Sequence, residues 1–143
     1  MTTIDGRQVI WRKDEEGAAE LRPGRFGTIM LGENVSVVRW EFPPGTPKGK
    51  FHSHADHEQW TYIISGRFEV QIGDEVTILE PGDVSYAPKG VMHGNTLVVG
   101  DEPVVVLDIF SPPREEYVNA AAGGPPVEVG GDDAGGGGTG GAR

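Results

Sequence analysis

Short strand-like segments separated by glycine and proline turns dominate the middle of this chain. Ser65-Gly66, Gly73-Asp74 and Pro81-Gly82-Asp83 each follow a short run rich in valine, isoleucine or aromatic residues. No stretch between residues 30 and 110 shows the 3.6-residue apolar period of an amphipathic helix. Turns at this spacing are typical of antiparallel hairpins in a sandwich or barrel. The sequence therefore predicts an all-β fold for this region.

One predicted strand alternates apolar and polar side chains, which is the pattern of a strand with one buried face. In the segment 35–42, Val38, Trp40 and Phe42 fall on one face and Arg39 falls on the other. A short helix is expected near the end of the domain, at residues 115–122. The predicted strands span residues 8–11, 35–42, 61–64, 67–72, 76–79, 84–87, 96–99 and 104–110.

Length and composition indicate one domain. With 143 residues, of which 36% are hydrophobic, the chain can bury a core but is too short for two domains. We predict a single domain over residues 1–122, with its core at about residues 30–112. Residues 123–143 are rich in glycine and nearly devoid of apolar side chains, so this tail is expected to be disordered.

The charge of the chain and the residues that it lacks restrict its partners. A net charge of −10 repels a phosphate backbone and argues against nucleic acid as a partner. The chain has no long uninterrupted apolar run, so we expect no membrane span and a cytoplasmic protein. Because the chain has no cysteine, any metal ion must be bound through nitrogen and oxygen atoms.

Three of the four histidines lie in the segment 50–60. His52 and His54 are two positions apart, so on an extended strand both imidazoles leave the same face and can reach one ion at about 2.0–2.1 Å. Gln59 opens the next predicted strand, where its carbonyl oxygen can approach the same ion. Residues of these types at this spacing predict a metal site. The fourth histidine, His93, follows a turn-rich run at the end of a later strand.

These segments resemble the two sequence motifs of the cupin family. Gly45–Gly66 is similar to the first motif, in which a glycine precedes His-x-His, a further ligand follows and a glycine closes the strand. Gly82–His93 is similar to the second motif in the spacing of its glycines, proline and histidine. The resemblance implies a double-stranded β-helix, or jelly roll, of two antiparallel sheets, with one divalent metal ion inside the mouth of the barrel. The ligands that it implies are His52, His54, Gln59 and His93.

The third ligand departs from the pattern of many cupins, which carry glutamate where this chain has Gln59. If Gln59 and Thr61 share the inward face of their strand, the neighbouring Glu58 points outward. Three neutral imidazoles and a neutral amide leave the ion at its full double positive charge, which makes it a stronger Lewis acid. The chain thus resembles the cupin subgroup that reads His-x-His-x-x-His-Glu-Gln. Its members include aromatic polyketide cyclases, uronate-processing proteins of pectin breakdown, and oxygenases.

The resemblance leaves several functions open. We expect an enzyme, and the leading hypothesis is a polyketide cyclase: the ion polarises a carbonyl of a small hydrophobic polyketone, a base removes an adjacent proton and the pocket shapes the substrate for aldol ring closure. Redox-inert zinc is sufficient for this chemistry and is the favoured ion. The first alternative is an oxygenase that holds Fe(II), Mn(II) or Ni(II) and acts on a small aromatic or enol substrate. A uronate-processing protein and a non-catalytic storage or sensor protein are the remaining alternatives.

Several residues outside the ligand set are candidates for catalysis. His57 shares strand parity with Gln59 if the chain is extended there, and three roles are open to it: a general base, a further ligand or an exposed turn residue. We select it as the catalytic candidate. Asp108 lies among apolar neighbours and is either an edge carboxylate or a buried one with a raised pKa.

Substrate binding is assigned by the chemistry of the side chains. Aromatic residues in these strands either line the pocket or fill the core. The substrate-binding candidates are Trp40, Phe42, Thr61 and Tyr86. A sugar acid would in addition need inward basic side chains beside the ion, and strand parity favours none of the available ones strongly. These are Arg39, Lys48, Lys50, Arg67 and Lys89.

A homodimer is expected from the strand content. An open sandwich of this size leaves exposed strand edges, where unpaired main-chain groups can bind another chain. The strands near the two ends of the domain are rich in valine and isoleucine and carry more apolar surface than one small sheet can cover. Pairing about a two-fold axis covers both features, and the cupin resemblance points the same way.

Overall fold

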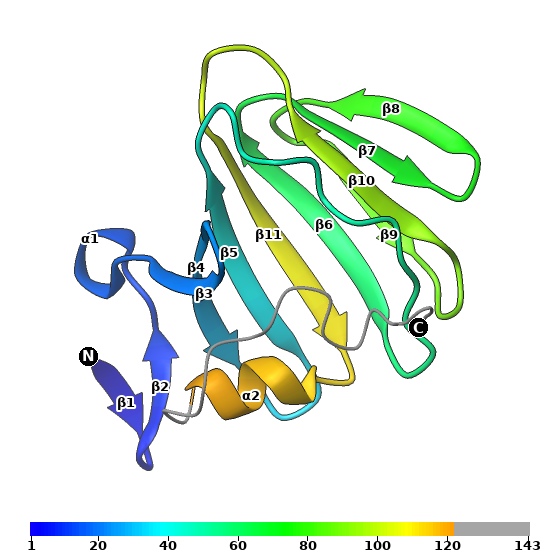
Figure 1. Cartoon of the computed structure of the whole chain (residues 1–143). Coiled ribbons are helices and arrows are strands. Elements are labelled where there is room, and N and C mark those ends of the chain that lie inside the picture. The colour runs from blue at the N-terminus through cyan, green and yellow to red at the C-terminus, as the bar shows by residue number, and fades with distance from the viewer. Residues whose placement is uncertain (122–143) are drawn as a thin grey trace.

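The structure of the chain, a computed structural model, describes residues 1–121. Antiparallel strands form two sheets that face each other, and a short helix lies across one end of the space between them (Figure 1). The fold is all-β and is the double-stranded β-helix that the sequence predicts. The tail predicted to be disordered, residues 123–143, lies outside the described residues.

Six strands form the larger sheet. In spatial order they are Ala19–Arg22 (β3), Arg25–Leu31 (β4), Ser36–Phe42 (β5), Val104–Ser111 (β11), Glu58–Ser65 (β6) and Val84–Ala87 (β9). The central strand β11 is antiparallel to both β5 and β6, although these lie far from it in the sequence. The smaller sheet consists of His93–Val98 (β10), Phe68–Ile72 (β7) and Glu75–Leu79 (β8), again in spatial order.

The remaining elements flank the sheets. Two N-terminal strands form a hairpin that pairs with no other strand of the described chain, a single helical turn follows them, and a longer helix follows β11. No helix within residues 1–121 is long and apolar enough to cross a membrane. The bounds of these elements are Thr2–Ile4 (β1), Arg7–Ile10 (β2), Lys13–Glu16 (α1) and Glu115–Ala121 (α2).

The core lies between the facing sheets. In β5 the burial alternates as predicted, with Val38, Trp40 and Phe42 buried and the residues between them half-buried. The rings of Trp40 and Phe42 stack with centroids 5.7 Å apart, and Phe42 stacks on Phe68 of β7 at 5.5 Å. Aromatic pairs of this kind contribute about 0.5–1.5 kcal/mol beyond the burial of their area. The stack therefore ties the two sheets together.

The sequence prediction missed the hairpin at the N-terminal edge of the larger sheet. Arg22 and Arg25 bound a tight turn that joins β3 to β4, whereas the sequence analysis assigns no strand to residues 19–31. Charged residues in β3 and a glycine in β4 hide the strand pattern. Gly27 faces the core, and a Cβ atom there would lie 3.1 Å from the main-chain oxygen of Arg39 and 3.1 Å from the Trp40 ring. A side chain there would have to displace its neighbours by a few tenths of an ångström, so close packing of β4 on β5 favours glycine despite its poor strand propensity.

Candidate metal centre and pocket

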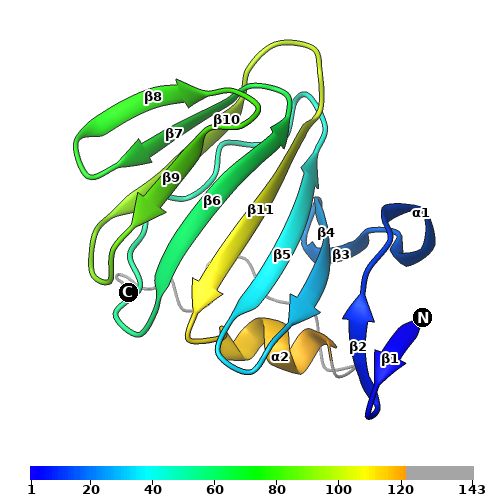
Figure 2. The ribbon, with the colours of Figure 1, turned by 180° about the vertical axis from the view of Figure 1, so that it is seen from behind.

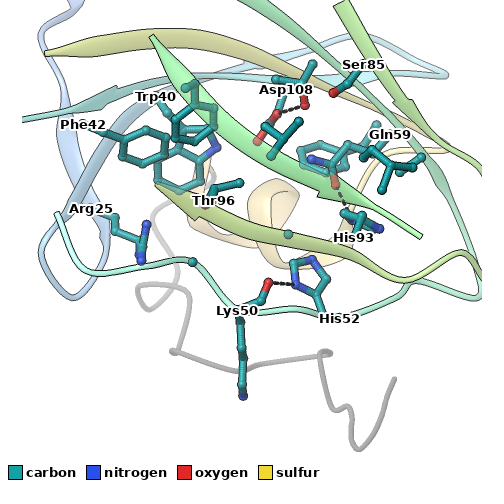
Figure 3. Close-up of a pocket in the computed structure, with 18 of the residues that line it drawn as sticks. Arg25, Trp40, Phe42, Lys50, His52, Gln59, Ser85, His93, Thr96 and Asp108 are labelled. Atoms are coloured by element: carbon teal, nitrogen blue, oxygen red, sulfur yellow. Dashed lines mark hydrogen bonds between the residues drawn. The ribbon is translucent and has the colours of Figure 1, made fainter. Parts of the chain in front are cut away.

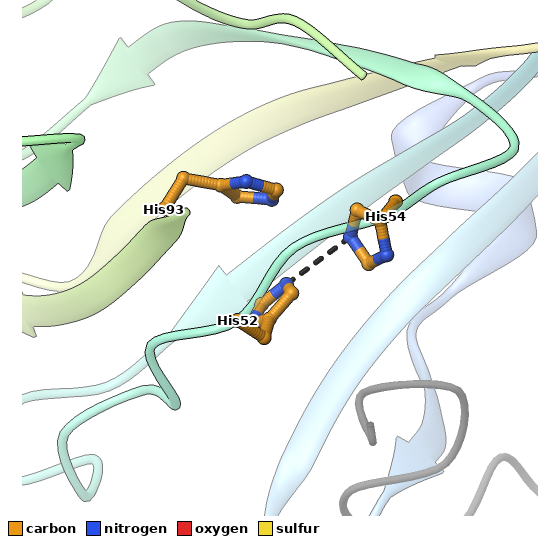
Figure 4. A group of neighbouring side chains, drawn as sticks. All are labelled: His52, His54 and His93. Atoms are coloured by element: carbon orange, nitrogen blue, oxygen red, sulfur yellow. Dashed lines mark hydrogen bonds between the residues drawn. The ribbon is translucent and has the colours of Figure 1, made fainter. Parts of the chain in front are cut away.

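Three histidines from two segments meet inside the barrel (Figure 4). His52 and His54 come from the segment that precedes β6, and His93 begins β10. One ring nitrogen of each lies within 4.8 Å of those of the other two, and the Nε2 atoms of His52 and His54 are 3.1 Å apart. His54 and His93 are buried, and His52 is half-buried. The structure therefore brings together the histidines that the sequence predicts as ligands.

Main-chain oxygens orient two of these rings. The Nδ1 atom of His52 is 2.9 Å from the carbonyl oxygen of Lys50, and the Nδ1 atom of His93 is 2.9 Å from that of Val91. A carbonyl oxygen only accepts hydrogen bonds, so each Nδ1 carries the proton and each Nε2 presents its lone pair. Neutral imidazoles held in one tautomer in this way are typical of metal ligands.

The two segments that carry the histidines are joined through the main chain. His52 and His93 exchange hydrogen bonds of 2.8 and 2.7 Å between their N–H and carbonyl groups. Next to this bridge, Gly94 has φ +124°, and a Cβ atom there would lie 1.9 Å from the Lys50 oxygen. Only glycine permits this close approach. The spacing between the histidines therefore depends on the backbone at Gly94.

Gln59 takes the position expected of the fourth ligand. Its Oε1 atom is 3.1 Å from the Nε2 atom of His93, and it faces the pocket from β6 together with Thr61. Glu58 lies on the other face of β6, where it accepts a 2.5 Å hydrogen bond from the hydroxyl of Tyr86. This hydrogen bond raises the pKa of Tyr86. The predicted strand parity is thus confirmed.

The donor set fits a divalent ion. The hydrogen bonds at Nδ1 direct the Nε2 lone pairs of His52 and His93 toward the space between the three histidines. The Oε1 atom of Gln59 lies at the edge of the same space. Burial in an apolar surrounding lowers the pKa of His54 far below its usual range, with a further contribution from the Arg114 charge. Neutral imidazole is the form that binds metals. The identity of the ion does not follow from these ligands, because several first-row metals accept nitrogen and oxygen donors.

His57 lies behind the histidine cluster rather than in the pocket. Its ring is buried, with its centroid 4.2 Å from that of His54 and 5.5 Å from that of Phe110. Burial, and then the positive charge of Arg114, lowers its pKa to about 4. The side chain does not line the cavity that contains His52 and His93. The structure therefore excludes the exposed role and leaves His57 outside the cluster of candidate ligands. Its ring packs on that of His54 and is placed to support it, and the general-base role stays a prediction.

A cavity of about 280 Å³ extends from the histidines between the two sheets (Figure 3). Trp40, Phe42 and Thr61 line it, as the sequence predicts. Tyr86 does not, and this expectation is corrected: its neighbours Ser85 and Ala87 face the cavity, while Tyr86 lies on the outer face of β9 with its ring stacked on Trp60. The alternation of side chains along a strand explains the difference, because adjacent residues face opposite sides.

Asp108 is the acidic side chain of the cavity. It lies on β11 opposite Thr61, whose hydroxyl donates a 2.6 Å hydrogen bond to its carboxylate. Burial raises the pKa of Asp108, although the hydrogen bonds from Thr61 and Gln59 favour its charged form. Asp108 is therefore not an edge carboxylate: it is half-buried, on a central strand of the larger sheet, and faces the cavity. A carboxylate beside a candidate metal ligand is placed to exchange protons with a bound molecule.

Basic side chains reach the same cavity. Arg25 lines it near the aromatic rings, donates a 2.8 Å hydrogen bond to the carbonyl oxygen of Pro47 and lies 5.8 Å from the Phe42 ring centroid (Figure 3). Burial and the nearby charge of Arg22 lower the pKa of Arg25. Lys48 also lines the cavity, whereas the side chain of Lys50 points away from it and its carbonyl oxygen faces His52 (Figure 3).

The sequence predicts only part of this basic lining. Of its candidates, Arg39, Arg67 and Lys89 do not line the cavity. Sequence reasoning missed Arg22, Arg25 and Arg114, which come from the two sides of the β3–β4 turn and from the residue before α2. Arg114 is buried, pairs with Glu116 at 2.5 Å, and its guanidinium carbon lies 4.9 Å from the Tyr117 ring centroid.

Solved structures with the same fold include two similar proteins. The structure of KdgF from Halomonas sp. superposes with a TM-score of 0.69 at 31% sequence identity, covering 76% of this chain and 98% of that one. An RmlC-like cupin from Shewanella frigidimarina superposes with a TM-score of 0.68 at 23% identity, covering 77% of this chain and 96% of that one. The second likeness supports the fold alone.

Sequence comparison agrees with the structures. The pectin degradation protein KdgF of Dickeya dadantii is 42% identical over 106 residues, which cover 73% of this chain and 94% of that protein. An uncharacterized protein of Streptomyces coelicolor is 32% identical over 104 residues, which cover 72% of this chain and 95% of that protein. The family model of the cupin domain matches residues 38–110, from the core of β5 to the end of β11. On the fold, the histidine cluster and these matches, the chain belongs to the cupin family.

Proposed function

We propose that this chain is a metal-dependent enzyme that acts on a sugar acid released during the breakdown of pectin. The observation that carries the proposal is the presence of basic side chains and a histidine cluster in one cavity. Pectin is a polymer of galacturonate, so its fragments carry a carboxylate, which is the group that a guanidinium binds best. The similarity to a pectin degradation protein, at 42% identity, supports the same class of substrate.

The size of the cavity supports a small substrate. Its volume of about 280 Å³ lies near the lower end of the usual range for ligand pockets. Trp40 and Phe42 supply flat apolar walls, and Arg25 lies beside Phe42. A single sugar unit can pack one face on these rings and direct its carboxylate to Arg25 and Lys48.

The reaction class follows from the groups that would touch the sugar. A bound divalent ion supplies Lewis-acid polarisation of a carbonyl or hydroxyl oxygen. Asp108 takes a proton from one atom of the sugar and returns it to another, and Thr61 holds the Asp108 carboxylate in place. Arg25 fixes the sugar carboxylate, so that the reacting atoms lie toward the histidines. These steps amount to a redox-neutral isomerisation by proton transfer.

The other hypotheses fit the site less well. The similarity to KdgF does not support a polyketide cyclase, and a cavity with several basic side chains suits an anionic substrate better than a neutral polyketone. An oxygenase would have to stabilise an oxidised metal, and the neutral imidazole and amide donors contribute little negative charge to that end.

A direct assay tests the proposal. Metal-free protein is loaded with zinc under nitrogen and supplied in parallel with galacturonate, with the unsaturated monomer that lyase cleavage of pectate yields, and with a linear polyketone. We expect a sugar acid to be converted, as followed by NMR spectroscopy. Conversion of the polyketone alone would restore the cyclase hypothesis. Turnover that needs both air and a redox-active metal would favour the oxygenase.

A further inference from the structure

The hydroxyl of Tyr117 is a buried polar group to which neither the metal centre nor the proposed reaction assigns a role. The side chain is 1% exposed, and it lines the same cavity as His52 and His93. It comes from α2, which lies at the end of the larger sheet next to β4 (Figure 2). The last helix of the described chain therefore brings a polar group into the cavity.

Contacts on several sides hold the ring of Tyr117. Its centroid lies 5.6 Å from that of Phe110 and 6.1 Å from that of Trp40, which it meets edge to face. The guanidinium carbon of Arg114 lies 4.9 Å from the same ring centroid. Because the ring is packed in this way, the direction in which the hydroxyl donates its proton is set by its hydrogen-bond partners.

Arg22 donates both hydrogen bonds that the Tyr117 oxygen accepts. Its Nε and Nη2 atoms each lie 3.3 Å from that oxygen. A phenol hydroxyl also carries one proton of its own to donate, and no atom of residues 1–121 accepts it. A buried donor without an acceptor is unfavourable. Since Tyr117 lines the cavity, a molecule bound there is the acceptor that can reach this proton.

Positive charge gathers at the same part of the cavity. Arg22 on β3 lies opposite Arg25 on β4 in the strand register, and both side chains line the cavity. Burial, and then the charge of Arg22, lowers the pKa of Arg25. The acidic neighbour of Tyr117 on α2, Glu116, pairs with Arg114 and does not line the cavity. Two adjacent guanidinium groups therefore favour an anionic group beside them.

We propose that the Tyr117 hydroxyl donates a hydrogen bond to the carboxylate of the sugar acid, and that Arg22 is a positioning residue that directs this donor into the cavity. The inference rests on the proposed function and deepens it, because it adds a substrate contact from α2 to the charge of Arg25. A donor of this kind binds a charged acceptor more strongly than a neutral one. The cavity thus selects the free acid over a neutral derivative of the same sugar.

Calorimetric titration of the zinc-loaded protein measures this selection. The probes are D-galacturonate and D-galacturonamide, which have nearly the same shape but differ in charge. We expect the wild type to bind galacturonate at least about 10-fold more tightly than the amide. Tyr117→Phe keeps the ring and removes the donor, so its Kd should rise by roughly 10- to 150-fold for galacturonate and by at most about 10-fold for the amide.

The matched control is Tyr62→Phe, which removes the hydroxyl of a tyrosine that is 41% exposed and lies outside the cavity. This variant should bind both probes as the wild type does. Equal loss of affinity for both probes in Tyr117→Phe would indicate a packing defect and overturn the proposal. Wild-type affinity for galacturonate in Tyr117→Phe would also overturn it, as would a wild type that does not distinguish the two probes.

The same titration separates this inference from the proposed function. Binding of galacturonate that depends on Tyr117, without turnover of any sugar acid, would overturn the proposed reaction and leave the inference standing. Turnover of a sugar acid by the wild type, together with an unchanged Kd in Tyr117→Phe, would overturn the inference alone.

A double-variant comparison tests the role of Arg22. Arg22→Lys keeps the positive charge but loses the two-pronged contact with the Tyr117 oxygen. It should weaken galacturonate binding by about 3-fold or more when Tyr117 is present and should have no effect in the Tyr117→Phe background. If the two substitutions instead act independently, Arg22 contacts the ligand directly and its positioning role is wrong.

Discussion

Asp108 on β11 lies directly opposite Thr61 on β6, and the Thr61 hydroxyl donates a 2.6 Å hydrogen bond to its carboxylate. Gln59, the candidate ligand, lies two positions before Thr61 and faces the same cavity. The register of one strand pair therefore fixes both the group proposed to move a proton and a group proposed to hold the ion. The proposed proton transfer would therefore take place beside the candidate metal site.

Replacing the carboxylate should separate catalysis from metal binding. Asp108→Asn keeps the shape of the side chain but removes the proton acceptor, so we expect kcat to fall by about 10²–10⁴-fold. Metal content, measured by mass spectrometry of the purified protein, should stay near the wild-type value. The control is Asp74→Asn, which changes an exposed turn carboxylate and should leave kcat unchanged. Equal activity of the two variants would rule out a catalytic role for Asp108.

The side chain proposed to hold the sugar carboxylate should affect substrate affinity. Arg25→Gln removes a charge-assisted hydrogen bond worth about 1.5–3 kcal/mol, so KM should rise by roughly 10- to 150-fold while kcat changes little. Arg67→Gln is the matched control, because Arg67 is half-exposed, pairs with Glu80 and lies outside the cavity. An unchanged KM in Arg25→Gln would show that the carboxylate binds elsewhere.

The position of His57 predicts a supporting role. Its ring packs on His54, so His57→Ala should lower the melting temperature and weaken metal binding by about 10- to 100-fold, the usual effect of removing a group that supports a ligand. At saturating metal, kcat should remain close to the wild-type value. Calorimetric titration with zinc and steady-state kinetics measure the two effects separately. A large fall in kcat with unchanged metal affinity would instead restore the general-base role.

The sequence predicts strand faces well where each strand has one buried side. The alternation in β5 and the inward position of Gln59 and Thr61 follow from the period of two alone. The same rule places His57 on the inward side with Gln59, where it contacts Phe110, but it does not show that the ring packs behind His54 instead of lining the cavity. Strand parity assigns a face to a side chain, and it does not say which neighbours on that face the side chain contacts.

The basic lining of the cavity could be predicted only in part. Arg25 and Arg114 belong to segments about 90 residues apart, and they meet because α2 and the β3–β4 turn both lie at the same cavity. No local pattern indicates such a meeting. The histidines can be recognised because their spacing within two motifs is itself the signal, whereas an arginine in a turn or at the start of a helix resembles any solvated residue.

Removal of a candidate ligand should lower the metal content of the protein, whereas removal of the neighbouring Glu58 should not. His93→Ala takes one ring nitrogen from the cluster and should remove most of the bound metal and the activity with it. Glu58→Ala changes a side chain on the outer face of β6 and should keep metal content near the wild-type value. The metal content of Gln59→Ala is expected to lie between those of His93→Ala and Glu58→Ala. Metal loss in Glu58→Ala together with full retention in Gln59→Ala would contradict the ligand assignment.

Gly94 should be required for metal binding although it touches no ion. A Cβ atom at this position would lie 1.9 Å from the Lys50 oxygen, the atom that accepts the hydrogen bond from Nδ1 of His52. Gly94→Ala must displace that main chain and with it the bridge between His52 and His93. We therefore expect folded protein that binds little metal.

Gly66→Ala provides the matched control for this last variant. Gly66 also has a positive φ, +81°, and a Cβ atom there would lie 2.4 Å from the carbonyl oxygen of Pro103, remote from the histidines. Strain of this kind costs about 1–3 kcal/mol, or roughly 4–12 °C in melting temperature for a domain of this size. Both variants should lose stability, but only Gly94→Ala should lose metal, as measured by zinc titration of protein shown to be folded by circular dichroism. Wild-type zinc affinity in Gly94→Ala would mean that the bridge does not set the spacing of the ligands.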